Sequence, residues 1–339
     1  MRLRATRIIE DTATTKTIRF ERLDGSIPPF RAGQYVNMFV EIDGVRTSRP
    51  YSISSPPGAD YLDLTVRDKP GGFVASHLLS NAKEGDEFET TGPAGSFYHE
   101  PLIDGKNLVF LAGGSGVTPF MSIIREQGDK GWPLNINLLY GCRVPDDVIF
   151  DKELKKLGKD NENFNCSIVI SEPPDKYRGL KGFLDEKVIK KQVGDVKDKT
   201  FYLCGPNAMY DFCLPVLEKL GVPRHKIKRE LYGPPDDATK EPGWPKKIKP
   251  DTLFEVEVEG RGKFKARASE PLMNSLERNG YVVPALCRSG ECSLCRTKLV
   301  SGKVFMPENN GVRESDHFYG YIHACVSYPL EDIVIRLEG

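Results

Sequence analysis

The sequence lacks the features that mark membrane, secreted and nucleic-acid-binding proteins. None of its apolar runs approaches the ~20 residues that a helix needs to cross a bilayer. The first residues, Met1-Arg-Leu-Arg-Ala-Thr6, are charged and contain no apolar secretory core, which predicts a cytoplasmic protein. Lysine plus arginine and aspartate plus glutamate balance at 48 each, so no basic field attracts nucleic acid. We therefore expect neither membrane insertion nor a nucleic-acid partner.

Internal repeats, heptads and long low-complexity tracts are also missing, which argues against solenoid and coiled-coil architectures. What remains is a chain of 339 residues, of which 39% are hydrophobic and 28% are charged. These proportions are normal for a globular protein, and the length predicts two or three domains.

Four cysteines near the C-terminus have an informative spacing. Cys287, Cys292 and Cys295 lie in the run Cys-Arg-Ser-Gly-Glu-Cys-Ser-Leu-Cys, and Cys325 follows far downstream. This C-x4-C-x2-C…C pattern is typical of a plant-type [2Fe–2S] cluster. Structural zinc prefers paired C-x2-C knuckles, and a disulfide framework needs an oxidising compartment. The spacing therefore predicts a cluster, and with it a protein that passes single electrons to a partner.

The chain divides by its pattern of apolar runs. Residues 1–102 alternate short apolar runs with Gly and Pro turns, which is typical of antiparallel strands in a sandwich or barrel. Residues 103–232 show strand-like runs separated by helical segments, a rhythm that predicts a parallel sheet covered by helices. The stretch 233–250 is rich in Pro, Gly and charge, the composition of a semi-stiff linker. Residues 251–339 begin with an alternating strand at 253–258 and carry the four cysteines.

The first region contains two motifs suited to a phosphate-bearing ring system. In Arg49-Pro-Tyr51-Ser52, the arginine and tyrosine fall on one face of a strand. The guanidinium can bind phosphate, and the tyrosine ring can stack on an aromatic ligand. Gly71-Gly72 then precedes a predicted helix that contains Ser76, so backbone N–H groups are available to an anion. Each motif alone could be a barrel strand and a turn, but together they indicate a flavin.

In the second region, glycine-containing turns follow the predicted strands. Gly113-Gly114-Ser115-Gly116-Val117-Thr118-Pro119 comes after an apolar run and opens a helix at Phe120, an arrangement that suits a pyrophosphate. Gly141-Cys142-Arg143 and Cys204-Gly205-Pro206 end two further strands. Ligands of parallel sheets bind beyond the carboxyl ends of the strands. Cys204 could be a small buried residue, but its place before Gly205-Pro206 favours a position beside the ligand.

In this order the motifs resemble the ferredoxin–NADP⁺ reductase superfamily. With the C-terminal ferredoxin region, the whole chain resembles reductases of the phthalate dioxygenase reductase type. It also resembles the reductase subunits of phenylacetyl-CoA epoxidase and hybrid-cluster-protein reductases. The resemblance implies a multidomain fold: an antiparallel β-barrel flavin domain, an α/β parallel-sheet nucleotide domain and a β-grasp-like ferredoxin domain.

The resemblance also implies roles for individual residues. Arg49 would contact the flavin phosphate, Tyr51 would stack on the isoalloxazine, and Ser52 would lie near flavin N5. Thr118 and Cys204 would border the nicotinamide, and Glu230 matches an acidic position near the flavin, although a surface glutamate is the alternative. The remaining positions would hold the flavin pyrophosphate or the nucleotide: Gly71, Gly72, Ser76, Gly113, Gly114, Gly116, Arg143, Gly205 and Pro206. Ser52, Cys204 and Glu230 are the candidate catalytic residues.

Three choices stay open in the sequence. FAD is favoured, with FMN as the alternative. NADH is favoured over NADPH, because Glu172 and Asp175 follow the relevant strand and would repel a 2′-phosphate, although Lys176 and Arg178 lie close by. The acceptor is an electron-accepting metalloprotein, such as an oxygenase component or a hybrid-cluster protein. The alternative function is a flavin and iron–sulfur redox sensor or regulatory subunit without rapid turnover.

Overall fold

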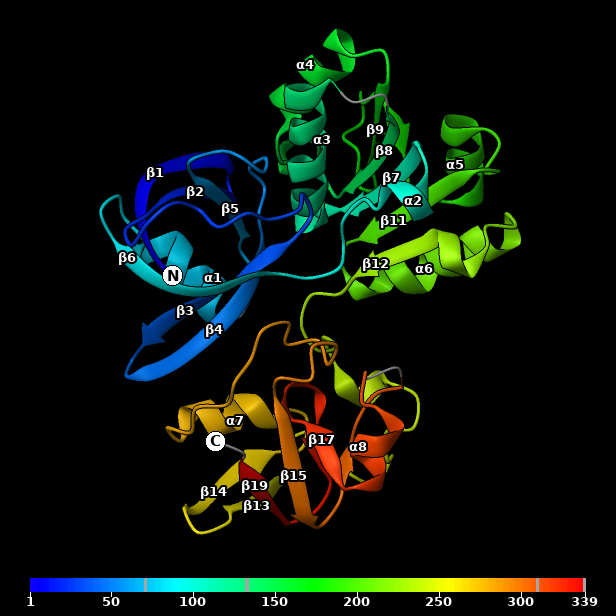
Figure 1. Ribbon diagram of the computed structural model, residues 1–339. Coiled ribbons are helices and arrows are strands. Elements are labelled where there is room, and N and C mark those ends of the chain that lie inside the picture. Colours follow the sequence, from blue (N-terminus) through cyan, green and yellow to red (C-terminus); the bar gives the residue numbers. More distant parts are fainter. Residues whose placement is uncertain (70–71, 132–133, 309–310, 338–339) are drawn as a thin grey trace. The chain divides into compact units, whose positions relative to one another are not determined.

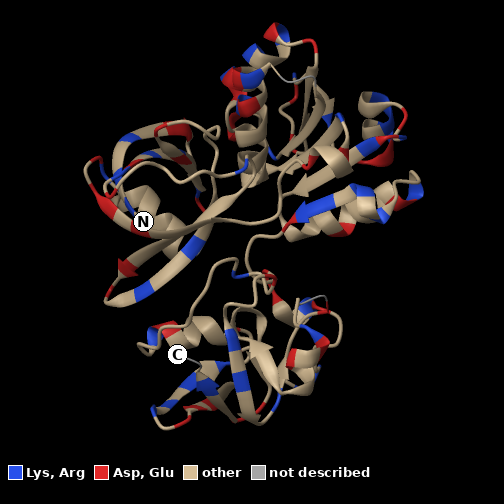
Figure 2. Ribbon diagram, in the orientation of Figure 1, with Lys and Arg blue, Asp and Glu red and all other residues tan. Residues whose placement is uncertain are grey.

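The computed structural model describes residues 1–69, 72–131, 134–308 and 311–337 (Figure 1). These residues form two compact units, one of residues 1–36 with 51–231 and the other of residues 37–50 with 232–339. Lys and Arg are interspersed with Asp and Glu over the elements of each unit (Figure 2). No helix among the described residues has the length and apolar character needed to traverse a bilayer.

The N-terminal sheet has six strands in the order β4-β3-β6-β1-β2-β5. The pairs β1–β2, β2–β5 and β1–β6 are antiparallel. Ile53, just after β4, bridges to Leu64 of β5, so the two edges of the sheet meet and close it. The expected antiparallel flavin-domain architecture is confirmed. Its elements are β1 (Arg2–Thr12), β2 (Thr15–Arg22), β3 (Tyr35–Ile42), β4 (Val45–Ser52), β5 (Leu62–Arg67), α1 (Phe73–Asn81) and β6 (Glu87–Ala94).

The second sheet is parallel throughout, in the order β10-β9-β8-β7-β11-β12. Apolar side chains of its central strands point to both faces, which is why these strands read as continuous apolar runs. The elements are α2 (Pro101–Asp104), β7 (Asn107–Gly113), α3 (Thr118–Lys130), β8 (Asn135–Cys142), α4 (Asp151–Asp160), β9 (Phe164–Ile170), β10 (Leu180–Lys181), α5 (Glu186–Val193), β11 (Lys199–Cys204), α6 (Asn207–Lys219) and β12 (Ile227–Glu230).

Helices cover both faces of this sheet, as expected for an α/β domain (Figure 1). On one face, Phe110 of β7 stacks on Phe120 of α3 with ring centroids 4.5 Å apart. On the other, Val109 and Leu111 pack in a buried cluster with residues of α5 and α6, among them Tyr210. Successive side chains of β7 point to opposite faces of the sheet, so one set packs against α3 and the other against α5 and α6.

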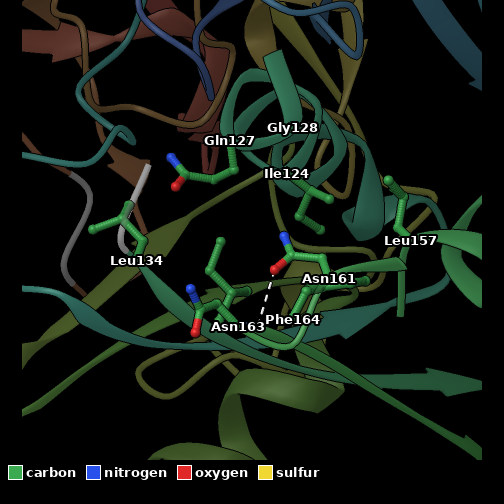
Figure 3. A pocket seen from close by; sticks show the side chains of 9 residues that line it. Ile124, Gln127, Gly128, Leu134, Leu157, Asn161, Asn163 and Phe164 are labelled. Carbon is green, nitrogen blue, oxygen red and sulfur yellow. Dashed lines mark hydrogen bonds between the residues drawn. The ribbon is translucent and has the colours of Figure 1, made fainter. Parts of the chain in front are cut away.

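A small cavity lies between α3, α4 and the amino ends of β8 and β9 (Figure 3). Its lining includes Ile124, Gln127, Ile136 and Phe164, and the lining residues that the structure describes carry no charge. It is therefore at the opposite end of the strands from the predicted nucleotide turns, and it is not the candidate site.

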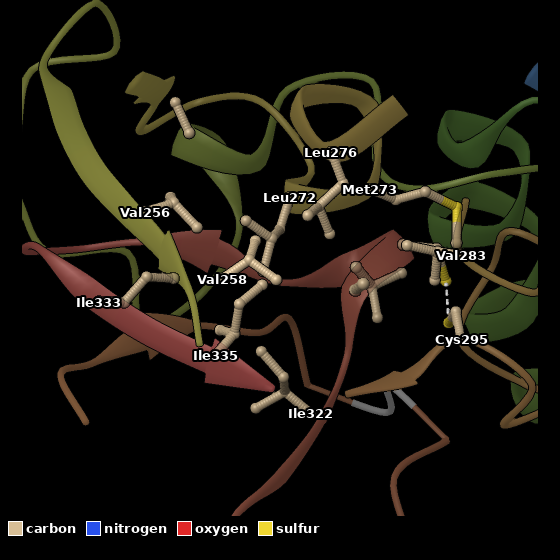
Figure 4. Packing of buried hydrophobic residues seen from close by; sticks show 14 of the residues in the cluster. Val256, Val258, Leu272, Met273, Leu276, Val283, Cys295, Ile322, Ile333 and Ile335 are labelled. Atoms are coloured by element: carbon tan, nitrogen blue, oxygen red, sulfur yellow. Dashed lines mark hydrogen bonds between the residues drawn. The ribbon is translucent and has the colours of Figure 1, made fainter. Parts of the chain in front are cut away.

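The C-terminal region forms a mixed five-stranded sheet in the order β14-β13-β19-β15-β17, with a separate pair β16–β18. Helix α7 places Leu272, Met273 and Leu276 in a buried core with strand residues (Figure 4). Cys295 and Cys325 belong to the same core. The elements are β13 (Leu253–Val258), β14 (Gly262–Arg267), α7 (Leu272–Arg278), β15 (Arg296–Ser301), β16 (Val304–Phe305), α8 (Glu314–Phe318), β17 (Tyr321–His323), β18 (Tyr328–Pro329) and β19 (Ile333–Leu337).

Part of the predicted linker packs against this region. Ala238 is buried together with Phe305 and Tyr328. The Trp244 ring lies edge-on to Phe305, with centroids 5.2 Å apart. These apolar anchors hold the middle of the segment 233–250 onto the cysteine-bearing region.

Candidate functional site

The predicted flavin motif lies at the end of β4. Arg49 and Tyr51 are both half-buried, whereas Ser52 is buried. One guanidinium nitrogen of Arg49, Nη1, donates to Thr47 Oγ1 at 2.9 Å and to the Ser48 carbonyl at 2.7 Å. These bonds orient the guanidinium along its own strand, and its contact with a flavin phosphate stays a prediction.

The predicted pyrophosphate motif opens helix α1. Gly72 is the N-cap and has no side chain, so the first-turn N–H groups are available to a phosphate. The Ser76 hydroxyl donates to Asp68 Oδ1 at 2.8 Å. Gly71 lies outside the described residues. This helix start fits a flavin phosphate, and the roles of Gly72 and Ser76 stay predictions.

The glycine turn after β7 packs directly against the turn after β11. A Cβ atom on Gly116 would lie 2.0 Å from the Cys204 carbonyl oxygen, so no other residue fits there. A Cβ atom on Gly113 would lie 2.9 Å from Pro206 Cδ. The absent side chains let the two turns meet at the carboxyl edge of the sheet, the edge where parallel sheets bind nucleotides. Two motifs about ninety positions apart in the sequence therefore form one edge.

Cys204 and Glu230 lie opposite each other, at the ends of the parallel strands β11 and β12. Both are buried, which removes the alternative that Glu230 is a surface residue. The Thr118 hydroxyl, also buried, donates to the Ser115 carbonyl at 2.8 Å. The structure thus places Thr118, Cys204 and Glu230 at the carboxyl edge, and their catalytic and binding roles stay predictions.

Sequence reasoning missed Tyr210, which ties this edge together. Its hydroxyl accepts from the Gly205 N–H at 3.1 Å and donates to the Glu230 carbonyl. Burial raises the pKa of Tyr210 well above its usual value, so the phenol keeps the proton that it donates. One feature of the sequence could have indicated Tyr210: it lies in the first turn of the helix that follows the motif Gly205-Pro206.

Arg143 extends from the end of β8 beside two carboxylates. Its Nε lies 3.8 Å from Asp147 Oδ2, and its Nη1 lies 3.9 Å from Glu172 Oε2. The Glu172 N–H donates to the Arg143 carbonyl at 2.8 Å, which anchors the acidic loop beside β8. Arg67, which the sequence did not single out, pairs with Asp147 at 3.2 Å. The predicted nucleotide residue Arg143 and the predicted specificity residue Glu172 are therefore neighbours.

The four C-terminal cysteines lie in one region as two pairs. The Cys287 sulfur accepts from the Ser289 N–H at 3.4 Å and the Cys292 N–H at 3.3 Å. The Cys295 and Cys325 sulfurs lie 3.2 Å apart. In the parts of the chain that the structure describes, no three His, Cys, Asp or Glu side chains gather as a single ion would require. Two thiol pairs are compatible with the two irons of a [2Fe–2S] cluster, and the four cysteines stay its predicted ligands.

The loop around these cysteines has a tightly wound backbone. Arg288 and Ser293 have left-handed backbones, with φ of 55° and 59°, which wrap the short segment tightly. A hydrogen bond from Cys292 lowers the pKa of Cys287 to about 5. A hydrogen bond from Cys325 likewise lowers the pKa of Cys295. The same bonds raise the pKa of Cys292 and of Cys325, so each pair has one sulfur that readily becomes the thiolate, the form that binds metal.

Three family models match the chain in succession. Residues 4–99 match the oxidoreductase FAD-binding domain, residues 110–214 match the oxidoreductase NAD-binding domain, and residues 256–330 match the 2Fe-2S iron-sulfur cluster binding domain. These matches agree with the three predicted sets of motifs, and flavin, nicotinamide nucleotide and a [2Fe–2S] cluster are the cofactors of the chain.

Relatives align over nearly the whole length. The glycine betaine monooxygenase reductase subunit of Pseudomonas aeruginosa is 28% identical, over 98% of this chain and 94% of its own. NADH oxidoreductase HCR of Escherichia coli is 29% identical, over 91% of this chain and 89% of its own.

The fold of phthalate dioxygenase reductase superposes with a TM-score of 0.73 at 23% identity, covering 99% of this chain and 98% of that one. The order of the three modules is therefore shared along the full length. The chain is an electron-transfer oxidoreductase that belongs to the ferredoxin–NAD(P)⁺ reductase superfamily, in the group with a C-terminal plant-type [2Fe–2S] domain.

Proposed function

We propose that this chain is the reductase component of an oxygenase system, and that it passes electrons from NADH through FAD and the [2Fe–2S] cluster to an oxygenase metalloprotein. The observation that carries the proposal is the full-length similarity to reductase subunits of monooxygenases, cysteine-bearing domain included. The 3-ketosteroid-9-alpha-monooxygenase ferredoxin reductase component of Mycobacterium tuberculosis also aligns over 98% of the chain.

When bound, the flavin accepts an electron pair from the nicotinamide and the cluster carries single electrons onward. The protein supplies position and electrostatics. The Gly113–Gly116 turn and the start of α3 would bind the pyrophosphate of NADH, with Cys204 beside the nicotinamide. The Arg49 guanidinium would bind the flavin phosphate, and Cys287, Cys292, Cys295 and Cys325 would hold the cluster.

We further place the protein in the cytoplasm. The predicted cluster ligands Cys287, Cys292, Cys295 and Cys325 form no disulfide in the described structure, and the reducing cytoplasm keeps such cysteines from oxidising to disulfides. The match to the oxidoreductase FAD-binding domain favours FAD. FMN is the alternative, and extraction of the bound flavin decides between the two.

The test compares two acceptors. With NADH, the purified protein should reduce ferricyanide, which can take electrons from the flavin, and also an oxygenase component or cytochrome c. The Cys292→Ser variant should retain ferricyanide reduction and lose most transfer to the protein acceptor. Equal loss with both acceptors would contradict the proposed route through the cluster.

The alternative, a redox sensor or regulatory subunit, makes the opposite prediction about rate. A reductase should turn over many times per second with NADH and a protein acceptor, within the ordinary range for enzymes. A sensor should be reduced once and then turn over slowly. Steady-state turnover with saturating NADH separates the two functions.

A further inference from the structure

The Thr47 hydroxyl joins three side chains within the unit formed by residues 37–50 and 232–339. It donates to Glu277 Oε2 at 2.9 Å. It accepts from Arg49 Nη1 at 2.9 Å and from Arg288 Nη2 at 3.2 Å. A hydroxyl has one proton to donate and two lone pairs to accept with, so all of its capacity is used.

This junction is buried. Thr47 is 3% exposed, and the side chains of Arg288 and Glu277 are 4% and 9% exposed. Arg288 and Glu277 form an ion pair with each other, and Arg288 Nη1 also approaches Asn274 Oδ1 at 3.4 Å. A buried charged pair requires hydrogen bonds to its remaining donors and acceptors, and Thr47 supplies one to each partner.

A second bond joins the same two segments. Asn37 Nδ2 donates to the Ala285 carbonyl at 2.9 Å. Asn37 and Thr47 lie on the two strands of the β3–β4 hairpin, and Ala285 and Arg288 flank the first cluster ligand, Cys287. The hairpin therefore contacts the cluster loop, residues 285–295, on both sides of that ligand.

The residues of this junction lie next to the predicted flavin and cluster residues in the sequence. Thr47 precedes Arg49, the predicted flavin-phosphate residue, by two positions on one strand. Arg288 directly follows Cys287. A single hydroxyl thus lies one hydrogen bond from the residue assigned to the flavin and one hydrogen bond from the neighbour of a cluster ligand.

We propose that Thr47 is a positioning residue that couples the flavin-phosphate residue Arg49 to the cluster loop, and so holds the loop ready to receive electrons from the flavin. The inference rests on the proposed electron route but not on the identity of the acceptor. Because coupling between two sites is reciprocal, the order of the loop and the affinity for flavin change together.

The test replaces the hydroxyl without changing the shape of the side chain. Thr47→Val removes the acceptor that Arg49 and Arg288 share and the hydroxyl that donates to Glu277, whereas Thr47→Ser keeps the hydroxyl. Thr200→Val is the matched control, because Thr200 is equally buried and its hydroxyl bonds the Asp104 carbonyl at 2.7 Å in the nucleotide domain. All variants are studied as complete proteins with flavin and cluster bound.

Two measurements are made. Hydrogen exchange followed by mass spectrometry reports the backbone amides of the cluster loop. We expect exchange about tenfold faster in Thr47→Val, the factor that corresponds to losing hydrogen bonds to charged groups. Anaerobic stopped-flow mixing with NADH then follows flavin and cluster absorbance separately. Cluster reduction should slow severalfold while flavin reduction keeps its rate, and flavin should dissociate more readily.

Thr47→Ser and Thr200→Val should match the wild type in both loop exchange and cluster reduction. Wild-type exchange and cluster reduction in Thr47→Val would overturn the proposal. If Thr47→Val does not fold, Thr47→Ala is used instead. We expect the same faster loop exchange and slower cluster reduction, and wild-type values of both would again overturn the proposal. These measurements use no oxygenase partner. A negative result would therefore contradict the role of Thr47 and not the proposed function as the reductase of an oxygenase system.

Discussion

Cys295 and Cys325 are 30 positions apart in the sequence, yet their sulfur atoms lie 3.2 Å apart. The cause is the antiparallel pairing of β15 with β17, in which Arg296 lies opposite His323. The Ala324 N–H also donates to the Cys295 carbonyl at 3.1 Å. Each cysteine thus lies just beyond the end of a strand pair. The pairing of β15 with β17 brings the predicted downstream ligand, Cys325, to the loop that contains Cys295.

Replacing the downstream ligand should remove the cluster alone. We expect Cys325→Ser to lose the cluster absorbance, the acid-labile sulfide and the electron paramagnetic resonance signal, while flavin supplied in excess still binds, because the flavin motifs lie in other segments of the chain. Cys166→Ser is the control, since Cys166 is a half-buried free thiol of the nucleotide domain. A Cys325→Ser protein with a full complement of sulfide would contradict the ligand assignment.

Gly116 should tolerate no side chain. In Gly116→Ala, the added Cβ would collide with the Cys204 carbonyl oxygen, so the two turns must separate. We expect a loss of about 2 kcal/mol or more in the free energy of unfolding and a raised KM for NADH. Gly128→Ala is the matched control for Gly116→Ala. Gly128 lies within α3, and a Cβ there would meet no neighbouring atom within 4 Å. It should stabilise the protein by about 0.5–1 kcal/mol. Chemical denaturation of both variants measures the difference.

Glu172 and Asp175 should select NADH. A carboxylate repels a 2′-phosphate and accepts a hydrogen bond from a free 2′-hydroxyl. The double substitution Glu172→Arg with Asp175→Ser should raise kcat/KM for NADPH about tenfold and lower it for NADH. It should change kcat with saturating NADH little.

Steady-state kinetics with both nucleotides decide this prediction. Glu162→Arg makes the same glutamate-to-arginine change at an exposed position before β9, at the other end of the strand, and should leave the preference unchanged. If the wild type already prefers NADPH, then Arg143, Lys176 or Arg178 binds the phosphate and the acidic loop does not select the nucleotide.

Asp104 should contribute to stability only while it is ionised. Burial by itself would raise its pKa, but hydrogen bonds from Lys228 at 2.6 Å and Tyr202 at 2.7 Å outweigh burial and hold the pKa of Asp104 below its usual value. A carboxyl with a lowered pKa in the folded state stabilises the protein above its unfolded pKa of about 3.9. That stability disappears as the pH falls through the lower folded value.

We therefore expect Asp104→Asn to lower the free energy of unfolding by about 2 kcal/mol at pH 7 and to shrink this loss below about pH 4. Glu87→Gln is the control, because Glu87 pairs with Arg2 and Arg4 at the surface, where ion pairs contribute little. Urea denaturation at several pH values checks both variants. A loss for Asp104→Asn that does not vary with pH would refute the electrostatic explanation.

The sequence by itself determined the features that arise from local patterns. The spacing of Cys287, Cys292 and Cys295 predicts the cluster loop, because one short segment would supply three ligands. The strands at 35–40, 108–112 and 253–258 were predictable from their apolar periods, and each lies within an observed strand. The glycine turn at Gly113 was predictable too, because a strand–turn–helix arrangement can be recognised from the residues directly before and after the turn.

Only the tertiary structure decided which distant residues meet. A strand's period of two shows which side chains share a face but not which strand lies beside it, so the pairing of Cys204 with Glu230 could not be read in advance. The same holds for Tyr210, whose hydroxyl bonds two separate segments. Thr47 is the clearest case. Its role depends on Glu277 and Arg288, more than two hundred positions away, because a hydrogen bond is set by distance and angle in space and leaves no pattern in the sequence.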